Sequence, residues 1–188
     1  EAWIFHSTDA GESWAEHPID VVRSGDFDVF VDVLIADHTD ANRAWVVMGP
    51  FLDDRLLETR DGGETFSEVY EPGGDIIDGA QDDNGSLWVI TTGNKLIFSE
   101  NGEFFQRVQT APLSLGVSAK MGMVYLANRI PSEGHPASVS QDGTSFSPIK
   151  AFENLTGPPN CATGTDSAVF CEPLWPQLQN ELGGSEPE

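Results

Sequence analysis

The sequence predicts an all-β protein built from repeated units of short strands. One pattern, Ser or Thr followed by Asp or Asn and then Gly, occurs four times. Its Asp or Asn positions, Asp9, Asp61, Asn101 and Asp142, are 52, 40 and 41 residues apart. Short apolar runs bounded by Gly, Asn and Asp lie between the copies, as expected for strands joined by turns. A spacing of about 40 to 50 residues is typical of supersecondary repeats.

The four copies of the pattern are called box turns 1 to 4, and they span residues 7–14, 59–66, 99–105 and 140–146. Their defining residues are Ser7, Asp9, Gly11 and Trp14; Thr59, Asp61, Gly63 and Phe66; Ser99, Asn101 and Gly102; and Ser140, Asp142, Gly143 and Phe146. An Asp or Asn side chain accepts hydrogen bonds from the backbone N–H groups that follow it, and Gly permits a positive φ. Each copy therefore predicts a tight, structural turn between two strands.

The box turns resemble the Asp-box, or bacterial neuraminidase (BNR), repeat. This repeat is found in β-propellers such as sialidases, sortilin-type receptors, some xyloglucanases and a photosystem II assembly factor. In that family the box joins the third and fourth strands of each blade and is structural. The resemblance therefore implies β-propeller blades over residues 1–152, and it implies no particular activity.

With one box turn per blade, the apolar runs between the box turns predict the positions of the strands. We expect them over 30–35, 44–48 and 55–59, then over 75–80, 86–90, 95–99 and 105–108, and finally over 113–117, 123–127, 137–140 and 146–149. Residues 3–7 align with 96–99, so we expect the chain to open at a third strand, as part of a longer polypeptide whose earlier blades are missing. About three and a half four-stranded blades result. Trp45, Trp88 and Tyr125 recur on the second strand of each unit, and we interpret them as packing between blades.

We expect residues 153–182 to form a C-terminal extension and residues 183–188 to form an acidic linker. The extension contains both cysteines, Cys161 and Cys171, at a spacing that fits neither a zinc site nor a thioredoxin motif. They predict a disulfide formed in an oxidising compartment. A cysteine pair and acidic linker after such repeats resemble the ends of secreted propellers from myxobacteria-like bacteria. This resemblance implies a secreted or cell-surface protein.

The charge of the chain excludes several partners. Nine basic residues stand against thirty-one acidic ones, giving a formal net charge of −22. Such a surface repels nucleic acid and anionic membranes. No apolar stretch in the sequence is long enough to predict direct membrane insertion.

Candidate catalytic residues are sparse. A sialidase of this family needs three arginines and a Tyr–Glu pair, with one arginine in an early Phe-Arg-Ile-Pro motif. Residues 128–131 read Asn-Arg-Ile-Pro but precede the last box turn, and Tyr70 and Tyr125 are the only tyrosines. A xyloglucanase-like pair of aspartates leaves no spacing to recognise, and Asp32, Asp75 and Asp78 lie where such acids would have to be.

No cofactor is predicted. Residues 82–85 (Asp-Asp-Asn-Gly) and Asp53–Asp54 are oxygen-rich and are weak candidates for Ca²⁺, because neither has the ligand spacing of a known calcium loop. His6, His17, His38 and His135 are scattered without metal-ligand spacing.

We therefore expect a non-catalytic extracellular scaffold that binds a protein or carbohydrate through the loops at 17–28, 49–54 and 130–136. The alternative is a glycoside hydrolase, sialidase- or xyloglucanase-like, whose site is completed by missing N-terminal blades. In either case the remainder of the same polypeptide is an expected partner.

Overall fold

The chain folds into strands throughout the described part up to residue 150. The computed structural model describes residues 2–20, 29–50, 52–93, 95–108, 111–129 and 135–150, together with Leu174 and Gln177. Cys161, Cys171 and the linker over 183–188 lie outside these residues, as does most of the extension over 153–182.

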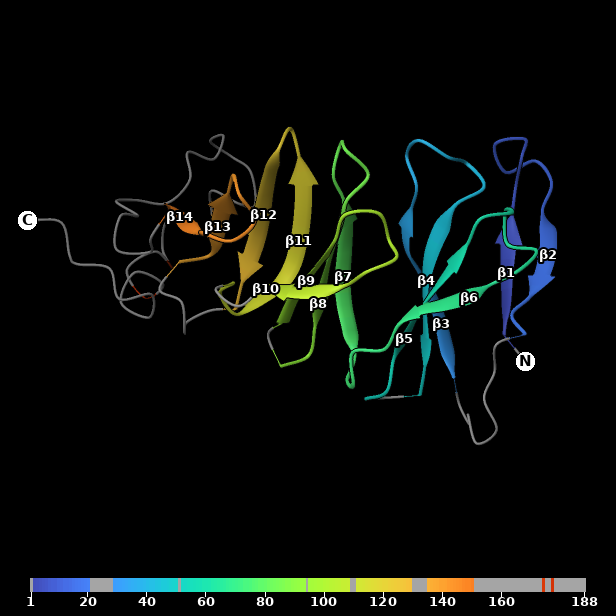
Figure 1. The fold of residues 1–188 in the computed structure, drawn as a ribbon, viewed down its shortest axis with the longest axis horizontal. Helices are drawn as coiled ribbons and strands as arrows, with labels where there is room; N and C mark the ends of the chain where they lie inside the picture. The colour runs from blue at the N-terminus through green and yellow to red at the C-terminus, as the bar shows by residue number, and fades with distance from the viewer. Residues whose placement is uncertain are drawn as a thin grey trace, which may run out of the picture.

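The strands form one two-stranded and three four-stranded antiparallel sheets, called sheets I to IV (Figure 1). Sheet I contains β1 (Trp3–His6) and β2 (Ala15–Pro18). Sheet II contains β3 (Phe30–Ala36), β4 (Ala44–Gly49), β5 (Arg55–Thr59) and β6 (Ser67–Tyr70). Sheet III contains β7 (Ile76–Gln81), β8 (Leu87–Thr91), β9 (Lys95–Ser99) and β10 (Gln106–Val108). Sheet IV contains β11 (Ser114–Lys120), β12 (Met123–Asn128), β13 (Ala137–Ser140) and β14 (Ser147–Lys150).

Strands that follow one another in the chain are neighbours in every sheet. The connecting turns therefore alternate between two edges. The box turns and the first turn of each four-stranded sheet lie at the same ends of the strands. This side of the molecule, formed by strand ends and turns, is called the box edge. The β3–β4, β7–β8 and β11–β12 turns mark it along the top of Figure 1. The connections that contain Asp54 and Asp75 lie at the opposite edge.

The core lies between the sheets, which stand in a row (Figure 1). Side chains of β4 alternate in direction: Val46 and Met48 pack in a cluster with residues flanking sheet I, whereas Trp45 and Val47 pack against sheet III. A third cluster joins sheets III and IV. Because both faces of β4 are covered, its sequence is a continuous apolar run and does not alternate between apolar and polar residues.

The recurring aromatic residues pack between sheets where a described sheet follows. Trp45 is 0% exposed and Trp88 is 7% exposed, which confirms the interpretation for both. Tyr125 differs, because it is 39% exposed. It lies on the face of sheet IV that turns away from sheet III, and no described sheet covers that face.

The predicted strands all form, with one clear difference in length. The sequence predicts a strand that ends at residue 117, whereas β11 continues to Lys120. The extension follows from a two-residue hairpin in which Met121 has φ 54° and Gly122 has φ 71°. Positive φ at both central residues is the geometry of a type I′ turn, which keeps both strands paired up to the turn. Among the described residues, no helix is long and apolar enough to cross a membrane.

Candidate functional site

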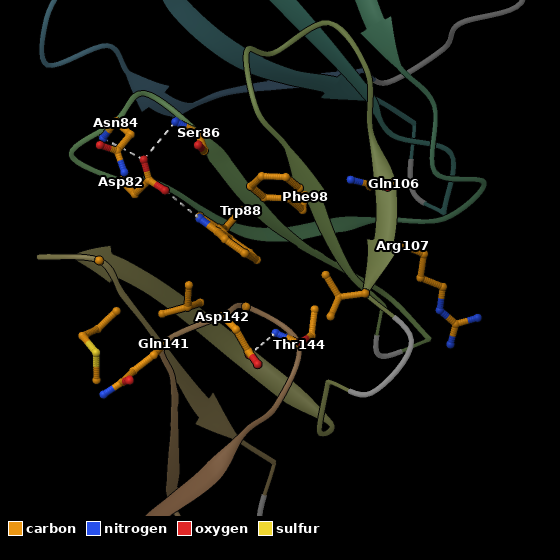
Figure 2. A pocket seen from close by; sticks show the side chains of 15 residues that line it. Asp82, Asn84, Ser86, Trp88, Phe98, Gln106, Arg107, Gln141, Asp142 and Thr144 are labelled. Atoms are coloured by element: carbon orange, nitrogen blue, oxygen red, sulfur yellow. Dashed lines mark hydrogen bonds between the residues drawn. The ribbon is translucent and has the colours of Figure 1, made fainter.

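A cavity of about 660 Å³ opens between sheets III and IV at the box edge (Figure 2). Strands β8, β9 and β10 and the β7–β8 turn line one side, and box turn 4 and the start of β12 line the other. We call it the inter-sheet cavity. Its volume is within the range of sites that hold small ligands, about 300 to 1,000 Å³.

Two aromatic side chains form the apolar floor of the cavity. The rings of Trp88 on β8 and Phe98 on β9 have centroids 4.5 Å apart and are tilted by 45°. Gly143 of box turn 4 lies directly against Trp88, since a Cβ at this glycine would come within 2.1 Å of the indole ring. Only a glycine permits this approach, so box turn 4 packs closely against the six-membered ring of the indole.

Asp82 supplies the acidic side of the cavity from the β7–β8 turn. Its Oδ1 accepts hydrogen bonds from the backbone N–H groups of Asn84 (2.9 Å) and Ser86 (3.0 Å). Its Oδ2 accepts from the Trp88 indole N–H at 3.4 Å. One oxygen therefore holds the turn, while the other is directed toward the aromatic floor (Figure 2).

Asp142 faces the cavity from box turn 4. Its Oδ1 accepts hydrogen bonds from the Ser140 hydroxyl (2.8 Å) and from the N–H groups of Thr144 (2.8 Å) and Ser145 (2.7 Å). These donors, with the Ser145 N–H the strongest, hold the pKa of Asp142 well below its usual range. The carboxylate is therefore ionised at every physiological pH.

Box turns 1 and 2 share one hydrogen-bond pattern. The Asp9 Oδ1 accepts from the Ser13 N–H at 2.9 Å, and the Gly11 N–H donates to the Ser7 hydroxyl at 2.8 Å. The equivalent bonds from Thr65 to Asp61 and from Gly63 to Thr59 are both 2.9 Å long. Hydrogen bonds from the Ser13 and Thr65 hydroxyls, followed by their backbone N–H groups, lower the pKa of Asp9 and of Asp61 to about 2.

The shorter box turn 3 keeps part of this pattern. The Gly102 N–H donates to the Ser99 hydroxyl at 2.9 Å, and the Glu103 N–H donates to the Asn101 side-chain oxygen at 3.0 Å.

The aromatic residue at the end of a box turn has two environments. Phe66 and Phe146 pack against the clusters that join their sheets to the preceding one. Trp14, by contrast, is 61% exposed, and its indole N–H donates to the Gly11 carbonyl at 3.2 Å.

The candidate acids on or near the inner strands have different surroundings. Asp78 accepts from the Gly79 N–H (2.9 Å) and from the Val117 N–H of β11 (2.7 Å), so it links sheets III and IV. Asp75 accepts from the Leu52 N–H at the edge opposite the box edge, and Asp32 is exposed on β3.

Sequence reasoning missed the burial of Asp54. This residue is 0% exposed, and its Oδ2 accepts from the Ile76 N–H at 2.7 Å. Its Oδ1 has no hydrogen-bond partner among the described residues. Burial raises the pKa of Asp54, and the charges of Asp75 and Asp53 raise it further. No feature of the sequence distinguishes Asp54 from the other aspartates in turns.

The predicted binding loops do not coincide with the inter-sheet cavity, whereas Asp82 and Asn84 of the weak calcium candidate line it. The cavity lies at the box edge, whereas residues 49–54 lie at the opposite edge, and most of 17–28 and 130–136 lies outside the described residues. Within the described part, no group of three or more His, Cys, Asp or Glu side chains is arranged to hold a metal ion. The weak calcium candidates at residues 82–85 and Asp53–Asp54 stay predictions.

Solved structures with a similar fold are β-propellers. A GH74 enzyme of Niastella koreensis matches with a TM-score of 0.53 and 25% identity over 79% of this chain and 22% of the enzyme. YCF48 from Cyanidioschyzon merolae matches with a TM-score of 0.47 and 20% identity over 64% of this chain and 36% of its own. A structure of YCF48 bound to D1 peptide matches with a TM-score of 0.44 and 15% identity over 70% and 49% of the two chains.

The comparisons assign no activity to this chain. The chain spans less than half the length of each of the three proteins. No protein-family model matches it, and no curated protein is similar to it in sequence. The likeness to the GH74 enzyme shows that the four-stranded sheets have the β-propeller fold.

Proposed function

We propose that this chain is a non-catalytic scaffold that binds a protein or carbohydrate ligand in the inter-sheet cavity. The observation that carries the proposal is the combination of an aromatic floor, Trp88 and Phe98, with a polar rim that includes Asp82 and Asp142. Apolar walls with a few placed polar groups are the usual composition of a binding site.

The state of the two carboxylates favours binding over hydrolysis. A glycosidase needs one carboxyl group whose raised pKa keeps it protonated as a general acid. Asp142 has a lowered pKa, and Asp82 is held by backbone N–H groups of its own turn. Asp142 is therefore suited to holding a polar or cationic group and unsuited to donating a proton.

The proposal includes a secreted or cell-surface location. It is supported by the formal net charge of −22 and by the two cysteines, since a stable disulfide requires an oxidising compartment.

The proposal is tested with peptide and glycan arrays probed by three forms of the protein. Gln106 is exposed on β10 at the rim of the cavity, and Gln106→Trp should obstruct it. Ser67 is the matched control position, because it pairs with Glu58 on β5 as Gln106 pairs with Phe98 on β9. We expect array binding that is lost in Gln106→Trp and retained in Ser67→Trp. Binding that survives Gln106→Trp would place the ligand elsewhere and overturn the proposal.

A glycoside hydrolase is the second candidate, favoured by the likeness to a GH74 enzyme. Release of reducing sugar from xyloglucan would support hydrolysis. Array binding without such release would support the scaffold.

A further inference from the structure

Sheets II and III have equivalent residues around the turn between their first and second strands. The Asp37 N–H donates to the Arg43 carbonyl at 3.0 Å, and the Asp82 N–H donates to the Ser86 carbonyl at 2.9 Å. The pairing across the next two strands is also equivalent, with Trp45 opposite Glu58 in sheet II and Trp88 opposite Phe98 in sheet III. Arg43 and Ser86 therefore occupy the same position in successive repeats.

The Arg43 side chain fills the space between sheets II and III at the box edge, here called the Arg43 slot. Its guanidinium carbon lies 4.4 Å from the centroid of the Trp45 ring. Its Nε donates to Glu58 at 2.6 Å, and its Nη1 lies 3.6 Å from Asp37. Its Nη2 donates to the backbone carbonyl of Asn101 in box turn 3 at 2.7 Å. One guanidinium group thus joins an aromatic ring, two carboxylates and the next sheet.

The inter-sheet cavity is the equivalent space between sheets III and IV. Ser86 replaces Arg43 there, and its short side chain does not span the gap. Trp88 remains as the floor, and Asp142 replaces Asn101 in the box turn that closes the far side. The space that a guanidinium group fills in one repeat is therefore open in the next.

The aspartate of the turn has the same orientation in both spaces. Asp37 uses Oδ1 to accept from the N–H groups of Thr39 and Asp40, and its Oδ2 faces Arg43. Asp82 likewise uses Oδ1 for its own turn and directs Oδ2 to the cavity floor. The oxygen that faces a cation in the Arg43 slot therefore has a counterpart at the inter-sheet cavity, which there accepts a hydrogen bond from the Trp88 indole N–H at 3.4 Å.

We propose that the inter-sheet cavity binds an arginine side chain of a partner protein. This inference rests on the proposed function and names the ligand chemistry of that site. A guanidinium group stacks on Trp and donates paired N–H groups to a carboxylate, which an ammonium group does less well. Phe98 takes the place of Glu58, so the inter-sheet cavity has one carboxylate fewer than the Arg43 slot and has a second aromatic surface. The volume of about 660 Å³ leaves room for residues that flank the arginine.

The charge of the surroundings fits a cationic ligand. Asp142 is ionised at every physiological pH, and the whole chain has a formal net charge of −22. Arg107, the one basic residue that lines the cavity in the described part, is exposed on β10 and points away from Trp88 (Figure 2). An arginine from a partner can therefore approach the floor between Asp82 and Asp142.

The test is calorimetric titration with three blocked tripeptides, acetyl-Ala-X-Ala-amide, in which X is arginine, lysine or citrulline. Citrulline has nearly the shape of arginine without its charge. We expect the arginine peptide to bind at least about tenfold more tightly than the citrulline peptide, because cation–π and charge-assisted contacts together account for such a factor. The lysine peptide should lie between them.

Ser86→Arg reproduces the Arg43 slot inside the cavity. It should weaken binding of the arginine peptide at least about tenfold without lowering the thermal midpoint, since the new side chain takes the proposed place of the ligand. Ser67→Arg adds the same charge outside the cavity and should leave binding unchanged. If Ser86→Arg does not fold, Asp142→Asn tests the inference instead. This variant should fold, because box turn 3 has Asn101 at the equivalent position. Loss of the charge should weaken binding of the arginine peptide about threefold or more.

The outcomes separate the two proposals. Equal affinity for the arginine and citrulline peptides, or no binding of either, overturns the arginine inference. If array binding is nonetheless lost in Gln106→Trp, the scaffold proposal still holds and its ligand is of another class, such as a carbohydrate. Arginine-peptide binding that survives Ser86→Arg or Asp142→Asn also overturns the inference.

Discussion

Arg43 and Ser86 occupy the same position in consecutive sheets, each accepting on its backbone carbonyl the N–H of the aspartate that begins the turn. The two residues therefore hold equivalent positions at the ends of their turns, and their side chains differ. With arginine, the gap to the next sheet is closed by ion pairs and a cation–π contact. With serine, the gap is a cavity. The side chain at this position thus contributes to whether an interface between two sheets is packed or open.

Arg43→Ala should destabilise the fold by about 3 kcal/mol, because it leaves the buried carboxylates of Asp37 and Glu58 without this partner. Arg60→Ala is the control, since Arg60 also contacts Glu58 but has a side chain that is 55% exposed. The Arg60→Ala control should lower the free energy of unfolding by less than about 1 kcal/mol. Urea unfolding of the three proteins measures the difference, and equal midpoints for the two variants would contradict the assigned role of Arg43.

Gly143→Ala should destabilise more than Gly73→Ala. The two glycines have nearly equal φ values of 68° and 69°, so the backbone strain of an alanine is matched at about 1 kcal/mol. At Gly143 the new Cβ also meets Trp88, whereas nothing lies within 4 Å at Gly73. The overlap should add about 1–3 kcal/mol. Thermal or urea unfolding of both variants checks this, and a Gly143→Ala variant as stable as its control would mean that box turn 4 does not press on the indole.

Stability should fall as the pH is lowered from about 4 to 2. In the folded protein the pKa values of Asp9 and Asp61 are lowered from 3.8 to about 2. A carboxyl group with a depressed pKa contributes stability above its unfolded pKa, and this contribution is lost as the pH falls through the folded value. Thermal midpoints between pH 5 and 2 provide the measurement. The Asp61→Asn variant should show a shallower decline, and an unchanged slope would show that Asp61 does not contribute.

Cys161 and Cys171 should form a disulfide in protein made in an oxidising compartment. The unreduced protein should resist alkylation, and its mass should rise by two hydrogens on reduction. Closing so short a loop contributes roughly 3 kcal/mol in the chain-entropy model, so reduction should also lower the thermal midpoint. Two alkylatable thiols in such material would refute both the bond and the proposed location.

The protein should self-associate or bind an apolar dye. Trp3 and Phe5 are 42% and 56% exposed on β1, and Leu115 and Tyr125 are 53% and 39% exposed on sheet IV. Neighbouring apolar side chains on an open sheet face favour association. Light scattering after size-exclusion chromatography should show that Trp3→Ser reduces association. Phe104→Ser, at an 81% exposed residue of a box turn, should not. A dye-silent monomer from the unmodified chain would show these faces to be inert.

The strands and turns follow from local sequence. The run from Ala44 to Met48 predicts β4 because a strand covered on both faces is apolar at every position. Box turn 2 predicts a tight turn because its main hydrogen bonds join residues no more than four apart, such as Thr65 and Asp61. Interactions of this range are encoded in the order of the residues, so they are predictable without a structure.

The cavity and the buried acid do not follow from local sequence. Ser86 is unremarkable until its sheet is superimposed on that of Arg43, and the register of the strands supplies this superposition. The burial of Asp54 depends on Ile76, which lies 22 residues further along the chain.

By itself, the sequence determined the all-β repeat, the positions of most strands and turns, and the acidic charge. Only the tertiary structure decided that Trp88 forms the floor of a cavity while Trp45 lies beneath an arginine. The physical reason is that each gap is closed or left open by side chains from two different sheets. Gly143 reaches Trp88 from 55 residues away, and no short-range pattern records that meeting.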